Sequence, residues 1–138
     1  MNIWIINGPN LNTLGRREPA VYGSIPFESY FPSLQQQYAG HRLLALQSNG
    51  EGELVSLLQQ AGEQADAVVL NAAAYTHTSI ALADAIRSIS IPVIEVHLSN
   101  IYARESYRHA SYLSPVCKGV ITGFGMDSYR LAIENLIR

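Results

Sequence analysis

The sequence has little cysteine and few charges, and each shortage excludes a class of protein. Its 138 residues contain one cysteine, Cys117, so neither an intrachain disulfide nor a cysteine-based zinc site is expected. Charged residues make up 14% of the chain, against about a quarter in an average domain. With a net charge of −2 the chain lacks the bulk attraction of proteins that bind nucleic acids or acidic membranes, and neither partner is expected.

Long apolar runs are absent as well. No stretch approaches the length of a membrane span, and the opening MNIWIING is strand-like rather than typical of a signal peptide. The length fits one domain, residues 1–138, with enough chain to bury a core. We therefore expect a soluble, cytoplasmic, single domain, and so few charges favour an oligomer.

Short apolar runs alternate with helical patterns along the whole chain. Five runs have the aliphatic composition of buried parallel strands: residues 3–6, 42–46, 67–70, 93–96 and 119–122. Three segments place apolar residues at helical spacing: 53–64, 79–89 and 128–137. Residues 25–38 form a further helical candidate, in which Pro26 suits the first turn and Pro32 predicts a break or kink.

Strands that alternate with helices pair in parallel through right-handed crossovers, which predicts an α/β three-layer sandwich. For five strands in a domain of this size we predict a flavodoxin-like parallel sheet with strand order 2-1-3-4-5. Ligands of such sheets bind outside the carboxyl ends of the strands, here residues 8–24, 71–79 and 95–104. These segments concentrate polar and titratable side chains: Asn10, Asn12, Arg16, Arg17, Tyr22, Asn71, Thr76, His77, Glu95, His97, Ser99 and Asn100.

Glu95 and His97 are two residues apart on a predicted strand, so their side chains leave the sheet on the same face. A carboxylate beside an imidazole fixes its tautomer and favours its protonated form, as a general acid or base requires. The alternative is a structural ion pair at a strand end. The position at the carboxyl edge favours the catalytic interpretation.

The first polar segment is long for a connection between a strand and a helix, and it contains Arg16, Arg17 and Tyr22. A guanidinium near Tyr22 would lower the pKa of its phenol and let it act as a base. The same residues are also typical of a solvated loop anchored by a packed tyrosine. In the second segment, Thr78 or Ser79 is expected to cap the following helix, and His77 contacts either a ligand or that cap.

Missing motifs exclude several other sites. The chain has no GxxxxGK[ST], no GxGxxG after the first strand, and neither HxH nor HExxH, so no nucleotide cofactor and no metal are expected. The only lysine, Lys118, precedes the fifth strand at the edge opposite the candidate site, so a Schiff base has no nucleophile.

A set of longer motifs resembles one family. Asn7 to Asn12, Arg17-Glu18-Pro19 and Tyr22-Gly23 resemble the amino-terminal signature of type II 3-dehydroquinate dehydratases. The similarity covers essentially the full chain and ends near Gly119 to Gly125. Its further motifs are Gln47-Ser48-Asn49 with Glu51 to Leu54, Asn71 with Ala73 and Tyr75 to Ser79, Ile91 to His97, Ser99-Asn100, Arg104-Glu105 and Ser111 to Pro115. Several long motifs in the same order make the resemblance specific.

The resemblance implies dehydration of 3-dehydroquinate to 3-dehydroshikimate by anti elimination through an enolate, without a cofactor or a covalent intermediate. Tyr22 matches the base, Arg17 the residue that keeps Tyr22 acidic, and Asn10 the holder of a water at the enolate oxygen. His97 matches the acid that protonates the departing hydroxyl, with Glu95 as its orienting partner. A further set matches substrate-binding positions: Asn71, His77, Leu98 through its backbone, Ser99, Arg108, and Asp84, which reaches the neighbouring subunit's site.

The family's fold is flavodoxin-like, and its assembly is a homododecamer built from trimers. Its reaction serves either the shikimate pathway of aromatic amino acid biosynthesis or the breakdown of quinate. The chain departs from common family residues at Ala83, Tyr102 and Ala110. The alternative function is a flavodoxin-like binding module for a small anion, without catalysis.

Overall fold

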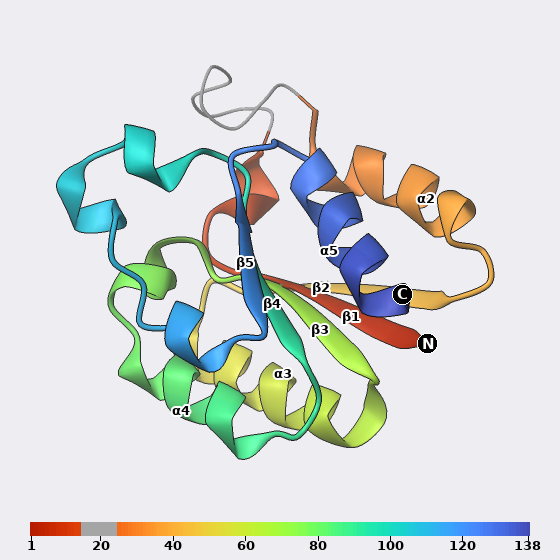
Figure 1. Cartoon of the computed structure of the whole chain (residues 1–138), viewed down its shortest axis with the longest axis horizontal. Helices are drawn as coiled ribbons and strands as arrows, with labels where there is room; N and C mark the ends of the chain where they lie inside the picture. The colour runs from red at the N-terminus through yellow and green to blue at the C-terminus, as the bar shows by residue number, and fades with distance from the viewer. Residues whose placement is uncertain (15–24) are drawn as a thin grey trace.

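The computed structural model describes residues 1–14 and 25–138, in which a five-stranded sheet is covered by helices on both faces (Figure 1). The strands are β1 (Asn2–Asn7), β2 (Arg42–Gln47), β3 (Ala67–Asn71), β4 (Val93–His97) and β5 (Gly119–Thr122). All neighbouring strands are parallel and their order is β2-β1-β3-β4-β5. Both the α/β class and the predicted strand order are therefore confirmed.

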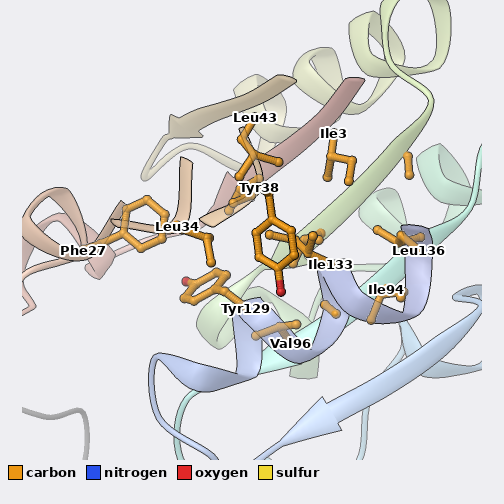
Figure 2. Close-up of a cluster of buried hydrophobic side chains, with 14 of the residues drawn as sticks. Ile3, Phe27, Leu34, Tyr38, Leu43, Ile94, Val96, Tyr129, Ile133 and Leu136 are labelled. Carbon is orange, nitrogen blue, oxygen red and sulfur yellow. The ribbon is translucent and has the colours of Figure 1, made fainter. Parts of the chain in front are cut away.

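Each face of the sheet is covered by two helices. Helices α2 (Phe27–Gln37) and α5 (Asp127–Ile137) lie on one side, and α3 (Glu51–Gln64) and α4 (Ile80–Ser88) lie on the other (Figure 1). Side chains alternate along a strand, so β1 sends Ile3 and Ile5 toward α2 and α5 and its intervening residues toward α3 and α4. Figure 2 shows the first of these two cores, where Tyr129 and Ile133 of α5 pack beside the sheet.

Of the break or kink predicted at Pro32, the break is wrong, because α2 continues through this residue. Pro32 lies on the exposed side of the helix, and so does Glu28, whose carbonyl loses its helical donor at residue 32. Water can replace that donor on an exposed face, whereas a buried carbonyl would stay unpaired. The predicted cap of α4 is confirmed at Ser79, whose Oγ accepts a hydrogen bond from the Leu82 N–H at 2.9 Å.

The carboxyl ends of the strands lead into short 3-10 turns: η1 (Leu11–Thr13), η2 (Ala73–His77), η3 (Ile101–Ala103), η4 (Ser106–Arg108) and η5 (Ser114–Val116). The turn after β1 requires glycine at its first position. The Gly8 N–H donates to the Asn71 carbonyl at 2.7 Å, and a Cβ at Gly8 would lie 2.6 Å from the Ala72 carbonyl oxygen. Within residues 1–14 and 25–138, no helix is both long and apolar enough to cross a membrane.

Candidate active site

A cavity lies beyond the carboxyl ends of β1, β3 and β4, at the edge where the sequence predicts the site. Seven of the predicted residues line it: Asn10, Asn71, His77, His97, Leu98, Ser99 and Arg108. Glu95 lies behind His97 and is fully buried. Arg17 and Tyr22 fall outside the described residues.

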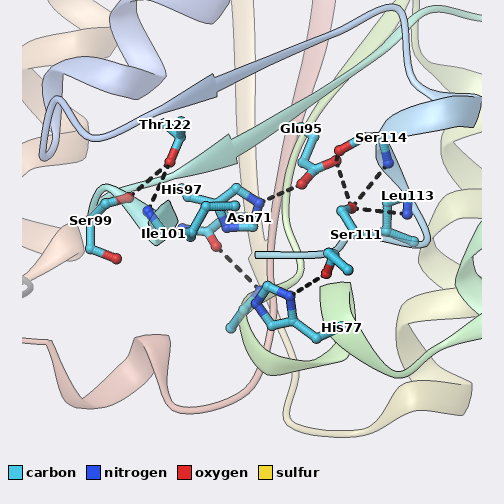
Figure 3. Close-up of polar contacts among 12 residues, drawn as sticks. Asn71, His77, Glu95, His97, Ser99, Ile101, Ser111, Leu113, Ser114 and Thr122 are labelled. Carbon is cyan, nitrogen blue, oxygen red and sulfur yellow. Dashed lines mark hydrogen bonds and ion pairs between the residues drawn. The ribbon is translucent and has the colours of Figure 1, made fainter. Parts of the chain in front are cut away.

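Glu95 and His97 form a buried pair on β4. The His97 Nε2 atom lies 2.5 Å from Glu95 Oε2, and only 5% of His97 is exposed (Figure 3). Because Nε2 is held by the carboxylate, Nδ1 is the ring nitrogen of His97 that serves the cavity. The pair predicted from the i, i+2 spacing is therefore present at the predicted edge of the sheet.

The second oxygen of Glu95 is held by two serines. Glu95 Oε1 accepts hydrogen bonds from Ser111 Oγ at 3.1 Å and Ser114 Oγ at 2.6 Å (Figure 3). Burial alone would raise the pKa of Glu95, but the hydrogen bonds of His97 and the two serines outweigh it and lower the pKa below its ordinary value. The carboxylate therefore stays charged and supplies a fixed counter-charge to a protonated His97.

His77 is held so that its Nδ1 atom donates a hydrogen bond to the backbone and its Nε2 atom is left as an acceptor. Its Nδ1 atom lies 2.7 Å from the Ala110 carbonyl oxygen, which can only accept, so Nδ1 carries the proton. Burial lowers the pKa of His77, and together with the electrostatic effect of His97 and Arg108 it outweighs the opposing effect of the hydrogen bond to Ala110 and of Glu95. A neutral imidazole with its proton on Nδ1 presents the Nε2 lone pair, and the ring stacks 6.2 Å from that of His97. Because the contact uses a backbone carbonyl, the departure at Ala110 leaves it intact.

Asn10 is held at the mouth of the cavity by the loop after β2. Its backbone is left-handed, with φ of 67°, and its N–H donates to Asn49 Oδ1 at 3.0 Å. Gln47 Nε2 donates to the same oxygen at 3.1 Å and to the Gly8 carbonyl at 3.2 Å. A left-handed backbone is more readily adopted by asparagine than by most residues. Asparagine at position 10 therefore suits the backbone conformation as well as the chemistry of the cavity.

The backbone of residues 97–99 is hydrogen-bonded to the last residue of β5 and to the segment that follows it. The carbonyls of His97 and Leu98 accept from the Gly123 and Gly125 N–H groups at 3.1 and 2.9 Å, and the Ser99 carbonyl accepts from Thr122 Oγ1 at 2.9 Å. Across a trans peptide the N–H points opposite to the carbonyl. The amides of Leu98 and Ser99 therefore point away from β5, as an anion-binding turn requires.

Two arginines, Arg104 and Arg108, line the cavity. Arg104 Nη1 lies 3.5 Å from Ser99 Oγ, and Arg108 Nε donates to Glu105 Oε2 at 2.8 Å. Sequence reasoning assigned a role to Arg108 but none to Arg104, although Arg104 also lines the cavity and its side chain is 16% exposed. Arg104 could have been found from its position in the loop after β4, seven residues beyond His97, because that loop follows the carboxyl end of a strand.

Asp84 does not contribute to this cavity. It lies on α4, where its side chain is 67% exposed and pairs with Arg87 at 3.0 Å. Ala83 beside it is buried against α3 and the sheet. Tyr102 is exposed and packs on His109, with ring centroids 5.8 Å apart, and it does not line the cavity.

The geometry agrees with comparisons to known proteins. The family model described as Dehydroquinase class II matches residues 1–137. The chain belongs to this family. It is 52% identical over 138 residues to a 3-dehydroquinate dehydratase of an Exiguobacterium species, covering 99% of this chain and 94% of the relative. A 3-dehydroquinate dehydratase of Trichodesmium erythraeum is 48% identical, covering 99% of this chain and 92% of the relative.

A solved structure shares the whole fold. The type II dehydroquinase of Butyrivibrio crossotus superposes with a TM-score of 0.96 at 42% identity, covering 100% of this chain and 98% of that one. The resemblance stated from the motifs is thus confirmed at the level of the family. As a class II dehydroquinase, the chain is an enzyme of the hydro-lyase class.

Proposed function

We propose that this dehydroquinase converts 3-dehydroquinate to 3-dehydroshikimate by anti elimination of water through an enolate. The observation that carries the proposal is the buried Glu95–His97 pair, which presents His97 to a polar cavity at the carboxyl edge of the sheet. A tertiary hydroxyl leaves slowly unless it is protonated, and a carboxylate-backed imidazolium supplies that proton. The family assignment supplies the substrate.

His97 acts as the acid in this proposal. Its Nδ1–H donates to the departing hydroxyl as the carbon–oxygen bond breaks, the enolate electrons form the new double bond, and water leaves. The other proton stays on Nε2, hydrogen-bonded to Glu95, so His97 ends the step as a neutral imidazole. The two serines on Glu95 Oε1 hold the carboxylate still throughout, which removes the need for reorganisation.

The base of the proposal is Tyr22, which removes the proton from the carbon next to the ketone, with Arg17 keeping its phenol acidic. Both assignments rest on the matching motifs. Asn10 would hold a water at the enolate oxygen, and its position at the mouth of the cavity supports that role. Hydrogen-bond donors at a developing oxyanion are a large contribution to enolate chemistry.

The remaining residues are proposed to bind the substrate with fixed hydrogen-bonding roles. His77 Nε2 accepts from a substrate hydroxyl, because its other nitrogen is committed to Ala110. The substrate carboxylate is proposed to bind the amides of Leu98 and Ser99, the Ser99 hydroxyl and Arg108, and the presence of all three residues in the cavity lining supports this. Arg104 adds a second positive charge there.

We also propose a homododecamer in which Asp84 reaches the site of a neighbouring subunit. The exposure of Asp84 away from its own cavity and the low charge content support this assembly. Light scattering after gel filtration tests it, and a monomeric mass would overturn it.

The function is tested with purified protein and 3-dehydroquinate, following the ultraviolet absorbance of the conjugated enone product. We expect turnover that survives borohydride in a parallel sample, since no imine forms. His97→Ala should lower kcat about 10²- to 10⁴-fold, as expected when a general acid is removed. His41→Ala is the matched control, because His41 lies at the amino-terminal edge beside Met1. Saturable binding without product would instead identify an anion-binding module.

A further inference from the structure

Tyr129 of α5 links the core to the cavity through its hydroxyl. The residue is fully buried, and its ring packs on Phe27 with centroids 5.0 Å apart (Figure 2). The hydroxyl donates to Asn7 Oδ1 at 2.7 Å and accepts from Asn71 Nδ2 at 3.1 Å. Asn71 lines the cavity, so these three side chains form a hydrogen-bond chain from the interior to the site.

The two asparagines are neighbours on one face of the sheet. Asn7 ends β1 and Asn71 ends β3, and the two are paired in the parallel register. Along each strand the residues two and four positions earlier face the core under α2 and α5: Ile3, Ile5, Ala67 and Val69. Both amides thus continue an apolar stripe, and Tyr129 from α5 reaches them at its end.

The hydrogen bonds among Tyr129, Asn7 and Asn71 fix the orientation of the Asn71 amide, that is, which side its Nδ2 and Oδ1 atoms face. Burial raises the pKa of Tyr129, so its phenol keeps one proton, and that proton goes to Asn7 Oδ1. Toward Asn71 the phenol oxygen can then only accept, which requires Nδ2 at that position. The Asn71 Oδ1 atom meanwhile accepts the Ala73 N–H at 3.3 Å. Asn71 Oδ1 is thus bonded to Ala73, and one hydrogen of Nδ2 is bonded to Tyr129. The second Nδ2 hydrogen is the group that Asn71 can donate to a ligand.

We infer that Tyr129 is a positioning residue that, with Asn7, fixes the Asn71 amide as a hydrogen-bond donor toward the substrate. The inference rests on the proposed function and adds a residue that lies outside the cavity to its substrate-binding set. The ligand group that Asn71 recognises is accordingly an acceptor, such as a hydroxyl or carbonyl oxygen of the substrate.

The test compares Tyr129→Phe with Tyr38→Phe. Tyr38 belongs to the same core cluster, is 6% exposed, and donates its hydroxyl to Glu134 Oε1 at 2.7 Å, away from the cavity. Each variant removes one hydroxyl from this core. We expect Tyr129→Phe to raise KM about three- to tenfold with kcat almost unchanged, the size of one lost hydrogen bond made equally in ground and transition states. Tyr38→Phe should change neither constant.

A double-mutant cycle separates positioning from a general loss of stability. Asn71→Ala should raise KM by itself, and adding Tyr129→Phe to it should raise KM no further, because the residue being positioned is gone. Additive effects on KM would overturn the inference. An unchanged KM in Tyr129→Phe would overturn it too. If Tyr129→Phe does not fold, Asn7→Ala removes the acceptor of the same phenol and should give the same rise in KM.

A crystal structure of Tyr129→Phe gives a readout that does not depend on turnover. We expect the Asn71 amide to be rotated or split between two orientations, and an unmoved amide with its hydrogen bond to Ala73 intact would overturn the inference. If the wild-type protein fails to convert 3-dehydroquinate, the proposed function fails. The position of Asn71 in the variant structure then decides the positioning role alone.

Discussion

Replacing Glu95 by glutamine tests the acid of the proposed reaction with a change of only one charge. The glutamine oxygen can still accept from His97 Nε2, and its amide nitrogen can face Ser114 Oγ, which accepts as well as donates. The side chain keeps its volume, so the fully buried position gains no cavity. What disappears is the negative charge that stabilises a protonated His97, together with the acceptor of the Ser111 hydroxyl.

The size of the effect follows from the geometry of the pair. With 2.5 Å between His97 Nε2 and Glu95 Oε2 and almost no exposure of either side chain, solvent screens the attraction poorly. Removing one partner of such a buried pair costs about 3–5 kcal/mol. His97 avoids part of this cost by staying neutral, but a neutral ring with its proton on Nε2 has none on Nδ1 to give. We therefore expect kcat to fall about 10²- to 10³-fold, at about 1.4 kcal/mol per factor of ten.

The enone absorbance assay measures this loss, with Glu63→Gln on the exposed surface of α3 as the control for a neutralised carboxylate. KM should change little, because the lost charge acts on proton transfer and does not touch the substrate. A Glu95→Gln enzyme with a kcat within a few-fold of wild type would refute the acid assignment. A rise in KM alone would make the pair a binding element.

The same variant also carries a pH prediction. The pKa of Glu95 is lower in the folded chain than in the unfolded one, so its charged form stabilises the fold above the unfolded pKa. That contribution is lost as the pH falls through the folded pKa. The difference in unfolding free energy between wild type and Glu95→Gln should thus be largest near neutrality and shrink on acidification, as urea unfolding at several pH values would show. A difference that grows toward acid would contradict the lowered pKa.

Two further predictions concern the fold around the site. Gly8→Ala should lower the free energy of unfolding by more than about 2 kcal/mol, because its Cβ would lie 2.6 Å from the Ala72 carbonyl oxygen. Gly52→Ala in α3 should instead raise the free energy of unfolding by about 0.5–1 kcal/mol, because its Cβ would have open space around it. Pro32→Ala should raise Tm, since it restores the helical donor to the Glu28 carbonyl, and a lower Tm in calorimetry would mean that the proline itself stabilises α2.

The fold and the Glu95–His97 pair could be predicted from the sequence because their signals are periodic or local. Alternating apolar runs predicted the five strands, the number of strands and the domain size predicted the flavodoxin-like order, and the i, i+2 spacing placed Glu95 and His97 on one face. The break predicted at the proline in α2 was wrong because the cost of an interior proline depends on whether the carbonyl it leaves unpaired faces water. Sequence shows residue 32, but it does not show which side of the helix is exposed.

The supporting groups were missed for a different reason. Ser111 and Ser114 hold Glu95 from 16 and 19 residues away, and Tyr129 contacts Asn7 across 122 residues. No spacing rule connects such pairs, because the contacts depend on how a loop or helix packs over the sheet. The serines fall within a family motif, which marked them as noteworthy without indicating what they touch.

These distant groups are what distinguish the cavity from a plain polar pocket. Three residues that face it have their hydrogen-bonding roles set by groups around the cavity: His77 by the Ala110 carbonyl, His97 by Glu95, and Asn71 by Ala73 and Tyr129. A site that merely binds an anion needs donors, and mobile ones suffice. Proton transfer needs each proton on one particular atom before the substrate arrives, because choosing among tautomers in the transition state would add to the barrier. The fixed tautomers and the fixed amide therefore favour catalysis over binding alone.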